Sequence, residues 1–220
     1  MMTPMDFLLL VRGPLFVVAV AIFMLGFGIR LVEILMLGRA RNFAEPRGSA
    51  MLGGFRTVYR RFSPDPGTFE RAPFDVVIGI LWHVGFIVAL FLFIPHVELI
   101  RKTFGIAWPA LPNPMIDAIA VITLLALFAA LVQRLRDPVK RFLSTPQDYL
   151  VWTLTFLPLL TGYLAYHRMI NPYPLILGLH ILSVEIFLIV APFTKLTHMV
   201  TAFVARWYNG ATFGRKGVQS

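Results

Sequence analysis

Four histidines lie within or at the ends of long apolar stretches, where a titratable ring is costly to bury. His83 and His96 belong to one stretch, and His180 and His198 bound another, "HILSVEIFLIVAPFTKLTH" (180–198). Ionisable side chains inside membrane-length segments usually bind a ligand or take part in chemistry. Because imidazole is a common ligand of metals and of haem iron, these four rings are candidate ligands.

The spacing of the histidines indicates which rings share a face of a helix. His180 and His198 are 18 residues apart, which is five full turns at ~100° per residue, so they share a face and are separated by roughly 27 Å. His83 and His96 are 13 residues apart, roughly 20 Å, and ideal geometry rotates them off a common face. Pro95 can bend or unwind the helix end just before His96, which would correct this mismatch.

The elements that must position these rings are membrane helices. The 220-residue chain is 58% hydrophobic and its mean hydropathy is +0.76, which is unlike a soluble domain. About 20 apolar residues cross a bilayer as a helix. We therefore expect an all-α integral membrane bundle of five transmembrane helices in a single domain, 1–220. The expected spans are 14–37, 74–95, 115–132, 149–166 and 175–197, with a loop at 38–73 between the first two.

Basic residues orient this bundle, because Lys and Arg are retained on the cytoplasmic side. Fifteen lie on one side and four on the other. We expect the N-terminus outside, the C-terminus and the 38–73 loop in the cytoplasm, and a multi-pass protein of the inner (cytoplasmic) membrane. The same bias explains most of the net charge of +9, so we predict no nucleic-acid binding. The fifteen are Arg39, Arg41, Arg47, Arg56, Arg60, Arg61, Arg71, Arg134, Arg136, Lys140, Arg141, Lys195, Arg206, Arg215 and Lys216.

This orientation places the histidines at two depths. His83 lies toward the cytoplasm at the level of His198, and His96 meets His180 near the outer face. Two imidazoles at each depth provide the axial ligands of two haems, and these must be b-type because the chain has no cysteine. Iron–sulfur clusters and disulfides within the chain are excluded for the same reason. Small residues beside the rings would let a flat macrocycle approach: Gly79, Gly85 and Gly178.

Other uses of these histidines are open at this stage. Zinc is one, but two ligands at each depth leave its tetrahedral shell half empty. A haem-free membrane anchor or a small transporter with a proton relay is another. The fifth histidine, His167, lies at a helix end and is interpreted as an interfacial side chain.

Two stretches around the candidate ligands resemble the haem-binding helices of the gamma subunit of respiratory nitrate reductase. They are "WHVGFIVAL" (82–90) and "LHILSVEIFLIVAPFTKLTH" (179–198). That family also has five spans and an outside N-terminus, and its fifth helix carries two histidines 18 apart with a Pro-Phe-Ser-Arg-Leu-x-His type ending, here Pro192 to His198. "RLRDPVKRFLSTPQDYL" (134–150) resembles its third loop. The resemblance covers most of the chain from the second span on.

The second span departs from the family pattern. The nitrate reductase subunits place a histidine ten residues after the first, where this chain has Phe93, and here the histidine is His96 within "FIPH". This form is more similar to the relatives that accompany sulfite-reduction complexes and heterodisulfide-reductase-like iron–sulfur subunits. By resemblance, His83 and His198 ligate the cytoplasmic-side haem and His96 and His180 the outer one.

The resemblance implies an electron-transfer subunit with no terminal catalysis of its own. Quinol (menaquinol or ubiquinol) would be oxidised beside the outer haem, and electrons would reach a cytoplasmic iron–sulfur partner. Arg101 and Lys102 are candidates for contact with quinone or a haem propionate, or they extend to the membrane interface. Glu185 carries protons for quinol or bonds to a neighbouring helix. The basic residues of 134–141 bind propionates, dock the partner or only orient the bundle.

Overall fold

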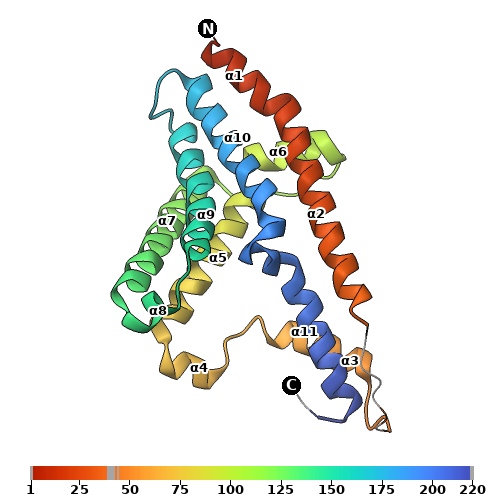
Figure 1. The fold of residues 1–220 in the computed structure, drawn as a ribbon. Coiled ribbons are helices and arrows are strands. Elements are labelled where there is room, and N and C mark those ends of the chain that lie inside the picture. The colour runs from red at the N-terminus through yellow and green to blue at the C-terminus, as the bar shows by residue number, and fades with distance from the viewer. Residues whose placement is uncertain (1, 39–42, 44, 219–220) are drawn as a thin grey trace. The chain divides into compact units, whose positions relative to one another are not determined.

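The computed structural model describes residues 2–38, 43 and 45–218. These residues fold into helices, with no strand among them (Figure 1). Within the described ranges, five helices are long and apolar enough to cross a membrane, which confirms the expected all-α fold with five spans. They are Pro4–Met36, Pro73–Leu92, Asn113–Arg136, Pro146–Tyr166 and Tyr173–Phe193. Arg39 and Arg41 of the expected cytoplasmic loop lie outside the described residues.

The first span begins at Pro4, ten residues before the expected start at residue 14. It consists of α1 (Pro4–Leu10), a π-helical segment (Val11–Leu15) and α2 (Phe16–Met36). Thr3 caps α1, because its hydroxyl accepts from the backbone N–H of Asp6 while the Asp6 carboxylate accepts from that of Thr3. This reciprocal capping box, with Pro4 in the first turn, starts the helix before the apolar run begins.

The contacts within the chain group into two compact units. Unit 1 comprises Met1–Phe16 and Ala72–Phe187, and unit 2 comprises Val17–Arg71 and Leu188–Ser220. The first and fifth spans each contribute to both units.

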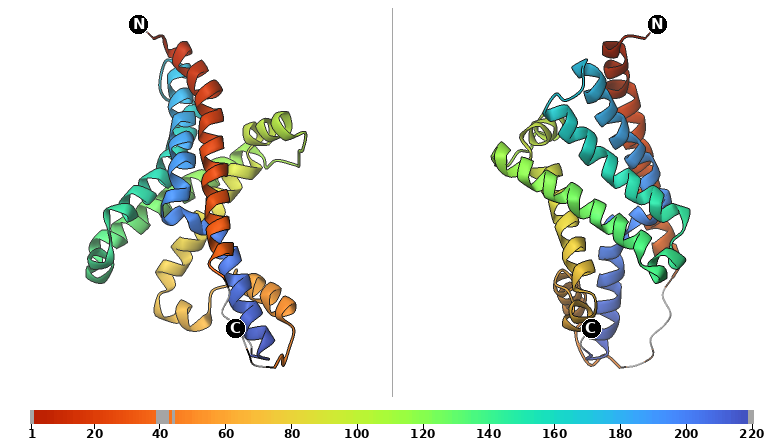
Figure 2. Two further views of the ribbon diagram at one scale, coloured as in Figure 1. Left: turned by 45° about the vertical axis from the view of Figure 1, so that its right-hand side comes forward. Right: turned by 90° about the vertical axis from the view of Figure 1, so that its left-hand side faces the viewer.

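Unit 1 is built on α5 (Pro73–Leu92), α7 (Asn113–Arg136), α9 (Pro146–Tyr166) and most of α10 (Tyr173–Val190), with the short α6 (Ile94–Phe104) and α8 (Pro138–Leu143). Glycines let these helices approach closely: a Cβ on Gly85 would overlap Thr123 of α7, and one on Gly178 would lie 2.6 Å from the ring of Phe7. The Trp152 indole N–H donates to the Leu127 carbonyl at 2.8 Å and joins α9 to α7. Figure 2 shows α7 beside α5 and α9 in two further views.

The second span ends before His96, which corrects the expected boundary at residue 95. Phe93 is extended, with φ −83° and ψ 129°, and α6 begins at Ile94 with Pro95 in its first turn. Pro95 has no N–H to continue the α5 hydrogen-bond ladder, so the helix breaks there. His96 therefore lies on α6, so its position does not depend on the helical phase of α5. The helix break that was expected at Pro95 is present.

The carbonyl groups released by this break are bound by the segment that follows. The Trp108 indole N–H donates to the Phe91 carbonyl at 2.6 Å, and the Leu111 N–H donates to the Leu92 carbonyl at 2.9 Å. Buried helix ends need such partners, since unpaired carbonyls are costly away from water. The loop after α6 thus fixes where α5 ends and where His96 begins.

Unit 2 contains α2, α3 (Ala50–Arg60), α4 (Pro66–Arg71) and α11 (His198–Arg215). α3 and α11 lie antiparallel through a glycine-lined contact (Figure 1). A Cβ on Gly214 would lie 2.8 Å from the Gly53 Cα, and one on Gly54 would lie 2.6 Å from the Trp207 indole nitrogen. Such spacing leaves no room for larger side chains, so the two backbones themselves are in contact.

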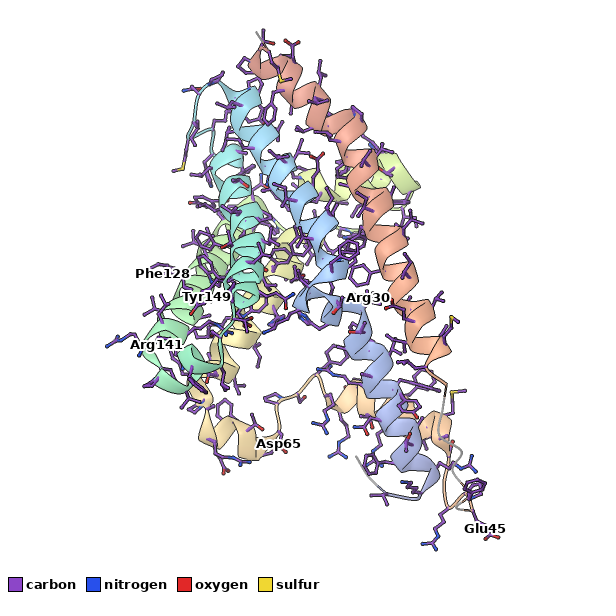
Figure 3. The ribbon with its side chains drawn as sticks, in the orientation of Figure 1. Arg30, Glu45, Asp65, Phe128, Arg141 and Tyr149 are labelled. Atoms are coloured by element: carbon purple, nitrogen blue, oxygen red, sulfur yellow. The ribbon has the colours of Figure 1, made fainter. Side chains whose placement is uncertain are left out.

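The fifth span also breaks, which corrects the expected helix over 175–197. After α10 come two 3₁₀ turns, Ala191–Phe193 and Lys195–Thr197, separated by the extended residue Thr194. Arg30, labelled in Figure 3, donates from Nε to the Pro192 carbonyl at 3.1 Å and thereby binds the broken end. Because the helix is not continuous, His180 and His198 do not share one face of it, contrary to the expectation from their spacing.

Candidate functional site

His96 and His180 come together within unit 1, although α6 and α10 supply them separately. Their ring centroids are 6.2 Å apart and their planes differ by 19°. Two imidazoles that bind one metal ion from opposite sides through Nε2, each at about 2 Å, have centroids roughly 6 Å apart. The pair that the sequence predicted for the outer site is therefore close to a ligating separation.

Hydrogen bonds at Nδ1 orient both rings. The His96 Nδ1 lies 2.9 Å from the Ala89 carbonyl, one of the groups released at the end of α5. The His180 Nδ1 lies 3.4 Å from the Thr161 hydroxyl oxygen, and that hydroxyl donates its own proton to the Leu157 carbonyl at 2.6 Å. Thr161 therefore accepts from Nδ1–H of His180. In this tautomer the lone pair is on Nε2, which is how metal-ligating histidines are usually held.

Gly162 of α9 makes room for the His180 ring. A Cβ on Gly162 would lie 3.0 Å from Cε1 and 3.2 Å from Nδ1 of His180, so the imidazole rests on the helix backbone. The sequence did not single out this glycine. The short connection between α9 and α10 could have indicated its role, because residues at similar distances from the turn of a helical hairpin face one another.

The three glycines that were expected to make room for a macrocycle have other surroundings. Gly85 packs against Thr123 and Gly178 packs against Phe7, so the space beside both glycines is filled by a neighbouring helix. A Cβ on Gly79 would meet nothing within 4 Å, and the carbonyl of this residue lies 2.6 Å from Nδ1 of His83.

Aromatic rings and burial complete the surroundings of His96. The Phe93 ring meets the His96 ring edge-on at 5.3 Å, and the Tyr166 ring meets Phe93 in the same way at 5.0 Å. Burial lowers the pKa of His96, which outweighs the opposite effect of its hydrogen bond to the Ala89 carbonyl. The imidazole is thus held neutral, and the neutral form is the one that binds a metal.

His83 and His198 are each exposed and are oriented by nearby carbonyl groups of their own segments. The His83 Nδ1 lies 2.6 Å from the Gly79 carbonyl, and the ring stacks on Trp82 at 3.5 Å. The His198 Nδ1 lies 2.7 Å from the Lys195 carbonyl at the start of α11. His83 belongs to unit 1 and His198 to unit 2, so their pairing stays a prediction.

Arg101 and Lys102 lie in the last turn of α6, and both are exposed. Arg101 forms an ion pair with Glu98 at 2.7 Å, three residues earlier. The hydrogen bond from Arg101 lowers the pKa of Glu98. The expected contact of these two cations with quinone or a propionate stays a prediction.

The acid predicted deep in the fifth span is buried. Glu185 is 2% exposed, and among the described residues its Oε1 has no hydrogen-bond partner. It lies seven residues after Gly178, two turns along the same face of α10, and that face packs on α1. Both expected roles of Glu185, carrying protons and bonding to a neighbouring helix, stay predictions.

Two of the four basic residues of 134–141 are held within unit 1. Arg134 donates to the Ser144 hydroxyl at 2.9 Å and lies 3.6 Å from Asp148, and Lys140 pairs with Asp75. Arg134 thus joins the end of α7 to the start of α9, and Lys140 joins α8 to the start of α5. Docking of a partner by this loop stays a prediction.

Among the described residues, no three His, Asp or Glu side chains gather at a point where they could hold a metal ion. The fit of the histidine pair to a metal is therefore a fit to two protein ligands. That number suits a haem iron, whose other four ligands come from the porphyrin.

No protein family model matches the chain, and no solved structure matches it. The chain is 32% identical over 149 residues to a protein of Nitratidesulfovibrio vulgaris whose name states no function. The matched stretch is 68% of this chain and 66% of that relative's length, slightly less than two thirds of the relative.

Proposed function

We propose that this multi-pass membrane protein is the dihaem b-type cytochrome subunit of a quinone-linked oxidoreductase. The single observation that supports this best is the His96–His180 pair, with near-parallel rings at 6.2 Å. The Nδ1 hydrogen bonds and the space made by Gly162 agree with it. A haem bound between these rings supplies an iron that takes up and releases one electron at a time.

The chain's own residues hold and insulate this site. His96 and His180 are the ligands of one haem, and we infer that His83 and His198 are those of a second. Thr161 and the Ala89 carbonyl orient the first two rings through Nδ1 and leave Nε2 of each as the ligating atom. The apolar spans exclude water. Quinol and a cytoplasmic iron–sulfur protein are the proposed electron donor and acceptor.

The test of this function is haem content. The full chain, purified in detergent from cells supplied with a haem precursor, should show a b-type reduced-minus-oxidised spectrum with about two haems per chain, one for each pair of axial histidines. A colourless protein with intact helical content would contradict the proposal and favour a haem-free membrane anchor or transporter subunit.

The proposed orientation has a separate test, because the natural chain contains no cysteine. Single substitutions Ser63→Cys and Met169→Cys lie on opposite sides in the proposed topology. A membrane-impermeant maleimide added to spheroplasts of an expressing bacterium should label the second and not the first. The reverse labelling would invert the topology and the assignment of the outer site.

A further inference from the structure

A second group of titratable side chains lies in unit 1 where α9 ends. His167 caps α9, and its Nε2 lies 3.2 Å from Oδ1 of Asp117 in the first turns of α7. The His167 ring also contacts two rings of α9, Tyr163 at 4.4 Å and Tyr166 at 5.1 Å. The side chains of His167 and Asp117 are 31% and 33% exposed, so each can reach a ligand or water. The expected interfacial histidine is therefore one half of an ion pair.

Aromatic contacts connect this pair to the candidate haem ligands. Tyr166, which touches His167, meets Phe93 at 5.0 Å, and Phe93 meets His96 at 5.3 Å. All of these residues belong to unit 1. Only two aromatic rings thus separate the His167–Asp117 pair from His96.

The chemistry of the pair is that of an oriented general base. With the Asp117 carboxylate accepting from Nε2–H, the His167 lone pair is on Nδ1, and the carboxylate stabilises the cation that forms when Nδ1 takes up a proton. A buried ion pair that only fixed two helices would not need access to solvent. The exposure of both groups lets an accepted proton leave to water.

We propose that His167, assisted by Asp117, accepts the protons of a quinol that is oxidised at this end of unit 1. The inference rests on the proposed function. In the balanced step both O–H bonds of the quinol break and two C=O bonds form. The two electrons would leave one after the other to the one-electron acceptor that His96 and His180 would hold, and each would be passed on before the next arrives. Each proton goes to Nδ1 of His167 and then to water, so that the base is restored.

The flat, partly exposed rings at this place suit an aromatic substrate. Tyr166 is 38% exposed, and Phe93 lies between it and His96. The remaining charged group on the connection is Arg168, whose guanidinium lies over the Tyr173 ring at 5.2 Å. The groups that face His167 are thus Asp117 from α7 and the two tyrosines from α9.

The test compares the full-length wild type with His167→Gln and Asp117→Asn, each purified in detergent with haem bound. Stopped-flow absorbance follows haem reduction by menadiol across pH. Removing the base should slow reduction at saturating menadiol by about 10²-fold or more. It should also flatten the dependence of the rate on pH. Asp117→Asn should slow it less, because the imidazole remains but loses the carboxylate that orients it.

Three further readouts separate a proton acceptor from a structural residue. Haem content, reduction by dithionite and the affinity for a quinone analogue, measured by quenching of intrinsic fluorescence, should stay at wild-type values in both variants. Asp117→Glu, which retains the carboxylate, should restore most of the rate. A variant that binds haem, keeps the wild-type rate at saturation and keeps the pH profile would overturn the inference, as would a change in affinity alone. Absence of haem from the wild type would instead overturn the proposed function.

Discussion

His96 and His180 lie against neighbouring helices, whereas His83 and His198 are oriented by carbonyls of their own segments. Thr161 and Gly162 of α9 meet the His180 ring, and the Ala89 carbonyl of α5 meets His96. The contact of His83 with Gly79, by contrast, is within one helix: its Nδ1 lies 2.6 Å from the carbonyl four residues earlier. The first pair is thus preorganised by packing within unit 1, whereas His83 and His198 belong to different units and are both exposed. Variants at these two places should differ accordingly.

Removal of His180 should have the largest effect. His180→Ala deletes an axial ligand, and we expect the haem content to fall from about two to about one per chain, with the loss confined to one spectral component. A pyridine haemochrome assay and a redox titration measure both quantities. His167→Ala is the matched control, since this histidine is also half-exposed in unit 1 but should leave both haems bound. Equal haem content in the two variants would remove the basis for the His96–His180 site.

A methyl group at Gly162 should have the next largest effect. Gly162→Ala places a Cβ 3.0 Å from the His180 ring, and crowding of this kind costs about 1–3 kcal/mol. Because a ligated ring cannot turn away without loss of its bond to iron, we expect haem to dissociate faster at this site. Transfer of haem to excess apomyoglobin measures the rate.

Gly79→Ala is the control for that experiment, because it adds the same methyl group beside the other histidine pair. A Cβ at Gly79 meets nothing within 4 Å, and alanine favours a helix more than glycine does. Haem retention should therefore equal that of the wild type. If Gly79→Ala loses haem and Gly162→Ala does not, the packing contrast drawn from the structure is wrong.

Loss of the Trp108 hydrogen bond should have a smaller effect on the same site. Trp108→Phe leaves the Phe91 carbonyl without its donor at the break before His96, at a cost of about 1–3 kcal/mol. We expect a lower thermal midpoint and partial loss of the His96–His180 haem. Trp152→Phe removes an equivalent indole bond, to Leu127 at 2.8 Å, away from the break. It should lower the thermal midpoint similarly but retain both haems.

The sequence predicted the number of spans and the histidine pair, because apolar runs and rare polar residues are strong signals in a membrane chain. It did not predict where α10 ends. Pro192 interrupts the helix and Arg30 binds its carbonyl, a contact across 162 residues that no local pattern reveals. The proximity of His96 to His180 therefore follows from their depth and from the break at Pro95, and not from helical phase.

Gly162 illustrates what the sequence left out of the candidate site. Glycines beside the histidines in sequence were expected to make room for the cofactor, but Gly85 and Gly178 are used for contacts between helices. The glycine that makes room for the His180 ring is 18 residues from it, on the preceding helix. Such a contact depends on how α9 packs on α10, which follows from the turn between them and not from the local composition.

Replacement of Thr161 should have the smallest effect and tests how the His180 ring is oriented. Thr161→Val keeps the shape but removes the oxygen that accepts from Nδ1–H of His180. This hydrogen bond makes the imidazole a stronger electron donor and so favours the oxidised iron. Its loss, worth about 0.5–1.5 kcal/mol, should raise the midpoint potential of this haem by about 20–60 mV. Thr153→Val, which removes an exposed hydroxyl bonded to the Tyr149 carbonyl, should leave the potential unchanged. A potential that falls in Thr161→Val, or that moves equally in both variants, would show that Thr161 does not set the tautomer of His180.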